Sequence, residues 1–340
     1  MVVTEQQSLA DMTTMRLGGK ARWVIEVATN DDLLLALHFA SERNLPWFVL
    51  GDGSNVIAKG DYEGVIILNR IAGFEKIDED DASATYKIGA GKVWDAVVER
   101  VCEANFSGIE AMSAIPGRAG STPVQNVGAY GQEIADTLVS LDAYDTNSNE
   151  FVTLSRDDCE FSYRNSVFKN PVTRHHIITS ITLRLRKTQM TPPFYPALET
   201  YLGSHGVTDY SPQNVRAAVI AVRAEKLPPV EKIASAGSFF KNPIIDKATA
   251  EQLLLEFPDA PHWPMGEDKV KLAAGWLIDQ AGLKGFSKYG MAVYPKNALV
   301  ITNQYATSSS DLEQFKSEII DIVRDQFGII LEQEPEDLSS

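Results

Sequence analysis

A glycine- and proline-rich stretch in the middle of the chain, residues 113–131, most constrains the fold; it reads SAIPGRAGSTPVQNVGAYG. It contains four glycines and two prolines but a single charged side chain. Glycine and proline interrupt helices and central strands, so a regular element is excluded here. The stretch is also too apolar for a solvated linker. We therefore expect a buried, tightly folded loop, although composition alone also permits an ordinary long turn.

A second loop of similar composition favours ligand binding over an ordinary turn. Residues 50–55 read LGDGSN. Glycines allow a backbone to approach a bulky ligand, and successive backbone N–H groups in such turns form concavities that bind anions. The pair of loops therefore indicates a site for a ligand that contains a pyrophosphate.

The N-terminal part predicts a small βαβ unit around the second loop. Apolar runs predict strands at 22–28, 47–50 and 65–68. Asn30 or Asp31 can cap a helix that runs to about Arg43. The glycine loop then follows a strand's carboxyl end, where ligands bind in such folds. It lacks the third glycine and the following helix of a dinucleotide-binding fingerprint, so a Rossmann domain is not predicted.

The remaining sequence predicts further helices and strands around a proline-rich linker or mobile flap at 187–212. Helices are expected at 92–104, 212–223, 271–281 and 310–326. Strands are expected at 84–88, 138–144, 151–154, 177–185, 298–302 and 329–332. The alternation after the flap indicates an α/β C-terminal domain.

Length and charge limit the classes of partner. A chain of 340 residues is expected to form two or three domains. Its formal net charge of −15 argues against a general nucleic-acid or anionic-membrane binder. The N-terminus carries no signal-peptide pattern, and no apolar run is long enough to span a bilayer. A cytoplasmic protein is therefore expected.

Cysteines and histidines give no sign of a metal site. Cys102 and Cys159 lie far apart and form no CxxC motif. The histidines show no ligand spacing such as HExxH, and His175 and His176 are expected to point to opposite faces at a strand start. Neither glycine-rich loop contains a histidine that could attach a flavin covalently.

Three kinds of side chain could carry chemistry. Arg164 could hold a carboxylate in two parallel hydrogen bonds, although a structural arginine is the commoner case. Ser238 follows a glycine in a short turn and could donate a proton to a developing carbanion, or be a plain turn serine. The acidic tail could deliver one carboxylate, but period-two alternation places Glu332, Glu334 and Glu336 on one face and cannot separate them.

Taken together, these segments resemble the UDP-N-acetylenolpyruvoylglucosamine reductase (MurB) family. The matching segments run in the family's order over nearly the whole chain. They are residues 14–19 (TMRLGG), 50–55 (LGDGSN), 115–117 (IPG) with 125–131 (QNVGAYG), 163–166 (YRNS), 236–243 (AGSFFKNP) and 274–285 (AGWLIDQAGLKG). The segment around Tyr195 resembles the substrate-covering loop of the type I subfamily.

The resemblance implies a three-domain α+β and α/β flavoprotein. Residues 1–72 and 73–210 would be FAD-binding subdomains of the vanillyl-alcohol-oxidase-like (PCMH) type, with the flap near 190–205. Residues 211–340 would form an α/β substrate-binding domain. Non-covalent FAD and NADPH are the implied cofactor and co-substrate. NADPH would reduce FAD, hydride would pass from flavin N5 to C3 of the enolpyruvyl ether of UDP-N-acetylglucosamine, and a proton would reach C2 to give UDP-N-acetylmuramate. A monomer acting on these small molecules is expected.

The resemblance also implies roles for individual residues. Arg164 would stabilise the charge that develops on the substrate carboxylate, Ser238 would protonate C2, and Glu334 would be the family's C-terminal carboxylate. Implied FAD contacts are Gly51, Gly53, Ser54, Asn55, Ile115, Pro116, Gly117, Gly120, Ser121, Gln125, Asn126, Gly128, Ala129, Tyr130 and Gly131. Implied substrate contacts are Tyr130, Tyr195, Lys226, Asn242 and Gln280.

Two positions depart from the family's pattern, and two other functions compete. Arg118 stands where a small residue is expected; it could contact a phosphate or point outward. After Glu334 the chain reads PEDL, where family members commonly carry an apolar strand. A related flavin oxidase would lack the GSFFKN and WLIDQ motifs, and a non-catalytic UDP-sugar binding protein would have no need of Ser238, Arg164 and a terminal glutamate together.

Overall fold

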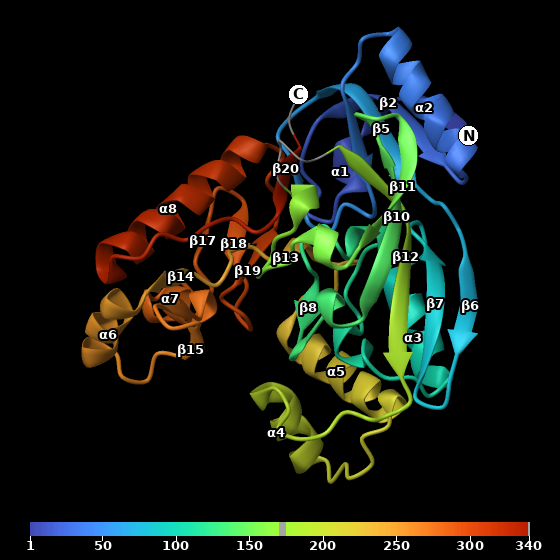
Figure 1. The fold of residues 1–340 in the computed structure, drawn as a ribbon. Helices are drawn as coiled ribbons and strands as arrows, with labels where there is room; N and C mark the ends of the chain where they lie inside the picture. The colour runs from blue at the N-terminus through green and yellow to red at the C-terminus, as the bar shows by residue number, and fades with distance from the viewer. Residues whose placement is uncertain (170–174, 339–340) are drawn as a thin grey trace. The chain divides into compact units, whose positions relative to one another are not determined.

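The computed structural model describes residues 1–169 and 175–338 (Figure 1). Internal contacts divide the chain into two compact units. The first consists of Met1–Gln6, Arg22–Asp52 and Glu63–Glu225. The second consists of Gln7–Ala21, Gly53–Tyr62 and the chain from Lys226 onward. The expected domain boundaries at residues 72 and 210 stay a prediction.

The first sheet confirms the βαβ unit. Its strand order is β1-β2-β5-β3, with bounds Val2–Ser8, Lys20–Val27, Tyr62–Asn69 and Trp47–Leu50. Strands β3 and β5 run parallel, and helix α2 (Asn30–Glu42) follows β2. The helix cap differs from the prediction, because the Thr29 hydroxyl accepts the backbone N–H of Asp32 at 3.1 Å. Asp32 in turn accepts the N–H of Ala28, the residue before the cap, at 3.0 Å, so its side chain fixes the incoming chain to the first turn of the helix.

The second sheet of the first unit is antiparallel, in the order β11-β10-β12-β7-β6. The strand bounds are Glu150–Ser155, Leu138–Asp145, His176–Arg186, Ser83–Gly89 and Phe74–Glu79. Helix α3 (Trp94–Glu103) packs on this sheet through Trp94, Val97, Val98 and Val101, which are at most 1% exposed. The predicted helix at 92–104 is therefore confirmed, and its apolar face closes the core.

The segment expected as a linker or mobile flap contains a helix. Helix α4 (Pro196–Ser204) packs against helix α5 (Pro212–Lys226). Their shared core consists of Phe194, Leu198, Leu202, Val215, Ala218 and Val219, with Tyr130 at its edge. Apolar residues in the segment thus form a packed helix pair within the first unit.

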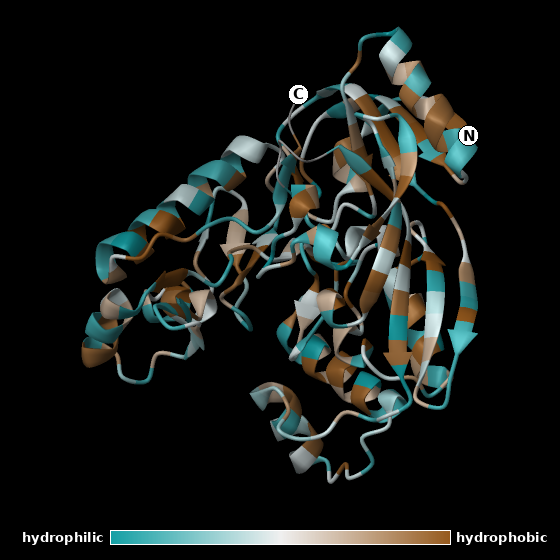
Figure 2. Ribbon diagram, in the orientation of Figure 1, coloured by the Kyte–Doolittle hydropathy of each residue, from teal (hydrophilic) through white to brown (hydrophobic). Residues whose placement is uncertain are grey.

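The second unit contains two larger antiparallel sheets. One has the order β13-β19-β18-β17 (Ala234–Ser238, Val300–Asn303, Met291–Val293, Ser287–Lys288) and the other β14-β16-β15 (Ile244–Asp246, Lys269–Leu272, His262–Met265). Helices α6 (Lys247–Glu256), α7 (Ala274–Gln280) and α8 (Ser309–Phe327) complete the core. Helix α8 alternates hydrophobic and hydrophilic residues along its length (Figure 2), and Leu312, Phe315, Ile319 and Val323 are fully buried. In the described part of the chain, no helix is long and apolar enough to cross a membrane.

The expected strand at 329–332 is wrong. Helix α8 ends at Gly328, whose φ of +68° is the left-handed cap that glycine favours. The chain then makes a single β-bridge, Phe240 with Gln333, and forms strand β20 (Glu336–Leu338) only later. Strand β20 pairs in parallel with β4 (Val56–Ala58). The apolar side chains Ile329 and Leu331 are buried in the core without belonging to a sheet.

An ion pair links helix α5 to helix α3 and to the central loop. Arg216 donates from Nη1 and Nη2 to the two carboxylate oxygens of Asp95 at 2.5 and 3.0 Å. The first of these oxygens also accepts the N–H of Ala114 at 2.6 Å. Burial works to raise the pKa of Asp95, but hydrogen bonds from Arg216 and Ala114 outweigh it and hold the pKa below its usual value.

We predict that Asp95→Asn lowers the free energy of unfolding by about 1–2 kcal/mol at neutral pH, a modest value because Asp95 remains partly exposed to solvent. A carboxyl whose folded pKa is depressed adds stability above its unfolded value of about 3.9 and loses it as pH falls. The difference from wild type should therefore shrink below about pH 4. Urea unfolding of the holoenzyme measures it.

Glu99→Gln is the matched control, because Glu99 is only a 3.7 Å partner of the same arginine and is 59% exposed. Its effect should stay below about 0.5 kcal/mol. Equal losses in the two variants would contradict the structural role of Asp95.

Candidate active site

The central loop is tightly folded, as the sequence predicts, but it contains a 3-10 turn (Ala119–Ser121) and a two-residue strand, β8 (Gly128–Ala129), which pairs with β9 (Gln132–Glu133). The structure also fixes the loop to the residues that follow strand β7. The N–H groups of Ala119 and Gly120 donate to the carbonyls of Lys92 and Ala90 at 2.8 and 2.9 Å. A Cβ on Gly120 would lie 2.5 Å from the Cβ of Ala90, so only glycine fits there. Left-handed backbone recurs along the loop, at Ala114, Gly117, Asn126, Tyr130 and Gly131. Such turns orient successive N–H groups toward one side.

The start of the 50–55 loop lies against the central loop within the first unit. A Cβ on Gly51 would come within 2.7 Å of the Ser121 hydroxyl. Arg118 donates from Nε to Asp52 at 2.6 Å and from Nη1 to the Gly91 carbonyl at 2.9 Å. Arg70 donates to the Gly51 carbonyl at 3.1 Å. Arg118 therefore joins the two loops and does not point outward, whereas a contact with a phosphate stays a prediction.

The predicted FAD contacts are divided between the two units. Gly51 and all the predicted contacts between Ile115 and Gly131 belong to the first unit, whereas Gly53, Ser54 and Asn55 belong to the second. The residues of the first unit suit an extended, negatively charged ligand. Gly131 has a φ of +88°, and a Cβ there would meet nothing within 4 Å, so its backbone faces open space. Half-buried apolar side chains, Ile115 and Val127 among them, lie on the same loop and suit a ring system.

Tyr130 and Tyr195 come together, although 65 residues separate them in the sequence (195 minus 130). Their ring centroids are 5.5 Å apart at an interplanar angle of 89°. The Arg223 guanidinium donates a hydrogen bond to Tyr130, while its Nε is buried and has no hydrogen-bond partner among the described residues. Burial raises the pKa of Tyr130, and the charge of Arg223 only partly offsets this. Burial likewise lowers the pKa of Arg223.

Arg223 is a residue that sequence reasoning missed. It lies seven positions after Arg216 in helix α5, so both arginines share a helix face. That spacing could have indicated a second arginine directed toward the same side. Without the fold, nothing in the sequence links Arg223 to Tyr130.

Arg164 lies at the tip of a tight turn that is bonded to the central loop. Ser162 and Asn165 exchange backbone hydrogen bonds of 3.1 Å in both directions. Arg164 has a left-handed φ of +53°, and its Nη2 donates to the Gly128 carbonyl at 3.2 Å. The turn thus holds the guanidinium beside the part of the loop that carries Tyr130.

In the second unit, Ser238 ends strand β13 at a β-bulge. Ser235 pairs with Thr302 and Ser238 with Val300, so the register shifts between them. Gly237 supplies the left-handed φ of +70° that the shift needs. Bulges of this kind redirect a side chain and often lie beside active sites. Phe239 and Phe240 follow as core residues that are at most 1% exposed and anchor the turn.

The C-terminal segment brings Glu334 next to this turn. The N–H of Glu334 donates to the carbonyl of Phe239, the residue after Ser238, at 2.9 Å. Glu334 is 8% exposed, whereas Glu332 points outward and pairs with Lys241 at 3.1 Å. Glu336 is half-buried in β20. The expectation that the three carboxylates share one face is therefore wrong, because the segment is not one continuous strand.

The other predicted substrate residues lie at helix ends. Asn242 accepts the N–H of Ala274 at the start of helix α7 at 3.0 Å, and Gln280 is exposed at the other end of that helix. Lys226 is the exposed last residue of helix α5. Asn242 and Gln280 are thus fixed by one short helix, while Lys226 belongs to another.

The two adjacent histidines do not point to opposite faces, contrary to the prediction. Their ring centroids are 4.1 Å apart, because His175 precedes strand β12 and is free of its alternation. The Nε2 atom of His175 lies 3.8 Å from the carboxylate of Asp145. Potential ligand atoms of these three residues all lie within 4.8 Å of one another.

Known proteins match this chain along its length. The profile of the FAD binding domain matches residues 21–155, and that of the UDP-N-acetylenolpyruvoylglucosamine reductase C-terminal domain matches residues 228–338. The UDP-N-acetylenolpyruvoylglucosamine reductase of Ralstonia nicotianae is 38% identical over 95% of both chains. That of Escherichia coli K12 is 38% identical over 96% of this chain and 94% of its own.

A solved structure agrees with these matches. The reductase of the same name from Thermus caldophilus superposes with a TM-score of 0.67 at 25% identity and covers 100% of both chains. Together with the profiles and the relatives, this confirms the resemblance drawn from the motifs. The chain belongs to the UDP-N-acetylenolpyruvoylglucosamine reductase (MurB) family.

Proposed function

We propose that this protein reduces UDP-N-acetylglucosamine enolpyruvate to UDP-N-acetylmuramate with FAD and NADPH, in the synthesis of peptidoglycan precursors. Family membership supports the reaction, because relatives that carry this name match almost the whole chain. The observation that supports the assignment of residues is the backbone hydrogen bond from Glu334 to Phe239, the residue after Ser238, together with the burial of Glu334. Reduction of an enolpyruvyl double bond adds a hydride to one carbon and a proton to the other, so the site needs a proton donor beside the hydride source.

The residues of the two glycine-rich loops are proposed to hold FAD without a covalent bond. Backbone N–H groups of the central loop would bind the pyrophosphate, and the half-buried apolar side chains would pack against the ring system. Arg118 and Arg70 act indirectly, by holding Gly51 and Asp52 against that loop. Bound FAD would supply the hydride that the reaction needs.

Three side chains are proposed as catalytic. Ser238 would donate the proton that reaches C2, since the bulge fixes its orientation at the end of a paired strand. Arg164 would stabilise the negative charge that develops on the substrate carboxylate, because a preorganised cation needs no rearrangement when the charge appears. Glu334 would act on the same intermediate, and it is the buried one of the three C-terminal glutamates.

Substrate contacts are proposed for Tyr130, Tyr195, Lys226, Asn242 and Gln280. The Tyr130–Tyr195 contact supports a joint role in covering the substrate, with Lys226 and Tyr195 facing the UDP part. The three-domain division at residues 72 and 210, a monomeric state and a cytoplasmic location are proposed with the same function.

A related flavin oxidase and a non-catalytic UDP-sugar binding protein are the competing functions. Reduced flavin that reoxidises only with oxygen would favour the oxidase. Purified protein without flavin would favour the binding protein.

We predict that anaerobic NADPH bleaches the purified flavoprotein and that the enolpyruvyl UDP-sugar restores its colour. Ser238→Ala should leave the bleaching rate within about twofold of wild type and slow the recovery about 10²-fold or more, because it removes a general acid. Stopped-flow absorbance separates the two steps. Ser235→Ala, in the same strand, should retain both, and a normal recovery in Ser238→Ala would reject this serine as the proton donor.

A second prediction concerns the three C-terminal carboxylates. Glu334→Gln should slow recovery of the flavin colour by about 10²-fold, because the buried carboxyl is removed while its size is kept. Glu332→Gln and Glu336→Gln should stay within about twofold of wild type, since neither carboxylate takes part in the proposed step. The same stopped-flow trace measures all three, and loss of activity in either flanking variant would move the catalytic role to that residue.

A further inference from the structure

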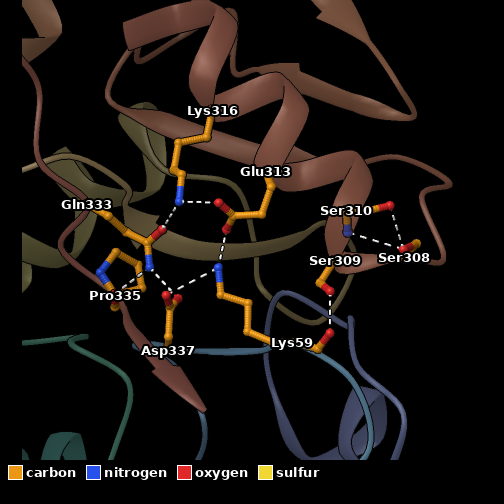
Figure 3. Close-up of polar contacts among 9 residues, drawn as sticks. All are labelled: Lys59, Ser308, Ser309, Ser310, Glu313, Lys316, Gln333, Pro335 and Asp337. Carbon is orange, nitrogen blue, oxygen red and sulfur yellow. Dashed lines mark hydrogen bonds and ion pairs between the residues drawn. The ribbon is translucent and has the colours of Figure 1, made fainter. Parts of the chain in front are cut away.

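A network of charged and polar side chains surrounds the segment that carries Glu334 (Figure 3). Lys59 pairs with Glu313 and, at 3.2 Å, with Asp337. Lys316 pairs with Glu313 at 2.5 Å and donates to the side-chain oxygen of Gln333 at 3.0 Å. The network joins helix α8, strand β20 and the residue after strand β4, all within the second unit.

Both the oxygen and the nitrogen of the Gln333 side-chain amide are hydrogen-bonded. Its oxygen accepts from Lys316, while its nitrogen donates to the Pro335 carbonyl at 2.8 Å and to Asp337 at 2.7 Å. These bonds reach across Glu334 from the residue before it to the residue after it. The backbone of Glu334 is also bonded to Phe239. The chain around Glu334 is therefore held on both sides.

The two lysines of the network are largely buried, while the side chains of Glu313 and Asp337 are 37% and 43% exposed. The side chain of Lys316 is 15% exposed and that of Lys59 is 24% exposed. The Ser309 hydroxyl donates to the Lys59 carbonyl and fixes the lysine backbone to the start of helix α8. Burial works to raise the pKa of Glu313, but hydrogen bonds from Lys316 and Lys59 outweigh it, so the pKa lies below its usual value. Two cations thus face two carboxylates at neutral pH.

The neighbouring ion pair of Lys241 with Glu332 differs in each respect. Its carboxylate, Glu332, is the residue before Gln333 and is 73% exposed, and the pair joins two side chains instead of a network. Exposed pairs of this kind contribute little. It therefore serves as a matched comparison for the Gln333 network.

We propose that Gln333, oriented by Lys316, is a positioning residue that fixes the carboxyl of Glu334 for the sugar-dependent half of the reaction. The inference rests on the proposed function. Gln333 acts through the backbone on either side of Glu334, and Lys316 acts through Gln333. A displacement of about 1 Å at a reacting group can cost about 10²-fold in rate, so loss of the amide should be measurable.

The first experiment compares Gln333→Leu with Glu332→Gln in the anaerobic two-step assay. Gln333→Leu keeps most of the side-chain volume and removes the three hydrogen bonds. Recovery of the flavin colour on adding the enolpyruvyl UDP-sugar should slow by about 10- to 100-fold, with bleaching by NADPH unchanged. Glu332→Gln should match wild type in both steps. Equal recovery rates in the two variants would overturn the proposal.

A double-mutant cycle tests whether Gln333 acts through Glu334. In the Glu334→Gln background, adding Gln333→Leu should slow recovery no further, because the group that it positions is gone. A multiplied loss would mean that Gln333 acts independently, which would overturn the proposal.

Lys316 supplies a second variant in case Gln333→Leu fails to fold. Lys316→Leu should slow only the recovery of the flavin colour and leave bleaching by NADPH unchanged. Lys316→Arg, which retains a donor, should keep most of the wild-type recovery rate. If both disruptive variants lose the NADPH step or their flavin as well, the network is merely structural and the proposal fails. Wild-type enzyme that never recovers its colour with the sugar would instead refute the proposed function.

Discussion

The first unit depends on a close approach between two backbone segments, residues 70–72 and 89–91, which leaves no room for side chains at the glycines. A Cβ on Gly91 would lie 2.2 Å from the carbonyl carbon of Arg70, and one on Gly89 would lie 2.4 Å from the carbonyl oxygen of Ala72. The central loop then stacks on the same turn through Gly120. The backbones of these segments are therefore in direct contact, and the N–H groups of the central loop stay close to the side on which a ligand would bind.

Local patterns predicted most helices and strands, since their cause lies within a few residues. The spacing of Val97, Val98 and Val101 was enough to indicate helix α3. Predictions failed where a distant partner decides. Residues 329–332 have the composition of a strand, but they pair with no other strand among the described residues. The next residue, Gln333, forms a β-bridge with Phe240, which lies 93 positions earlier (333 minus 240), and strand β20 then pairs with β4. The histidine pair failed for a similar reason, because His175 lies just outside its strand.

For the candidate site, motifs located the segments but not the contacts between side chains. Strand alternation could not separate the three C-terminal glutamates. In the structure, the bridge of Gln333 with Phe240 and the turn after it bury Glu334 but neither Glu332 nor Glu336. Asp52 and Arg118 are 66 positions apart, and nothing local pairs them. Gln333 likewise depends on Lys316 from helix α8 and on a turn that no pattern specifies. Such contacts follow from topology, which a single sequence does not display.

Sharing of the Asp95 carboxylate has a thermodynamic consequence for the flap. One oxygen serves both Arg216, on the helix that packs against α4, and Ala114, at the entrance to the central loop. Order in the loop and order in the helix pair are therefore linked through a single anion. A ligand that orders the loop therefore reduces the entropy that remains to be lost when the helix pair becomes ordered. Ligand binding at the loop thus favours an ordered helix pair without a change in the mean structure.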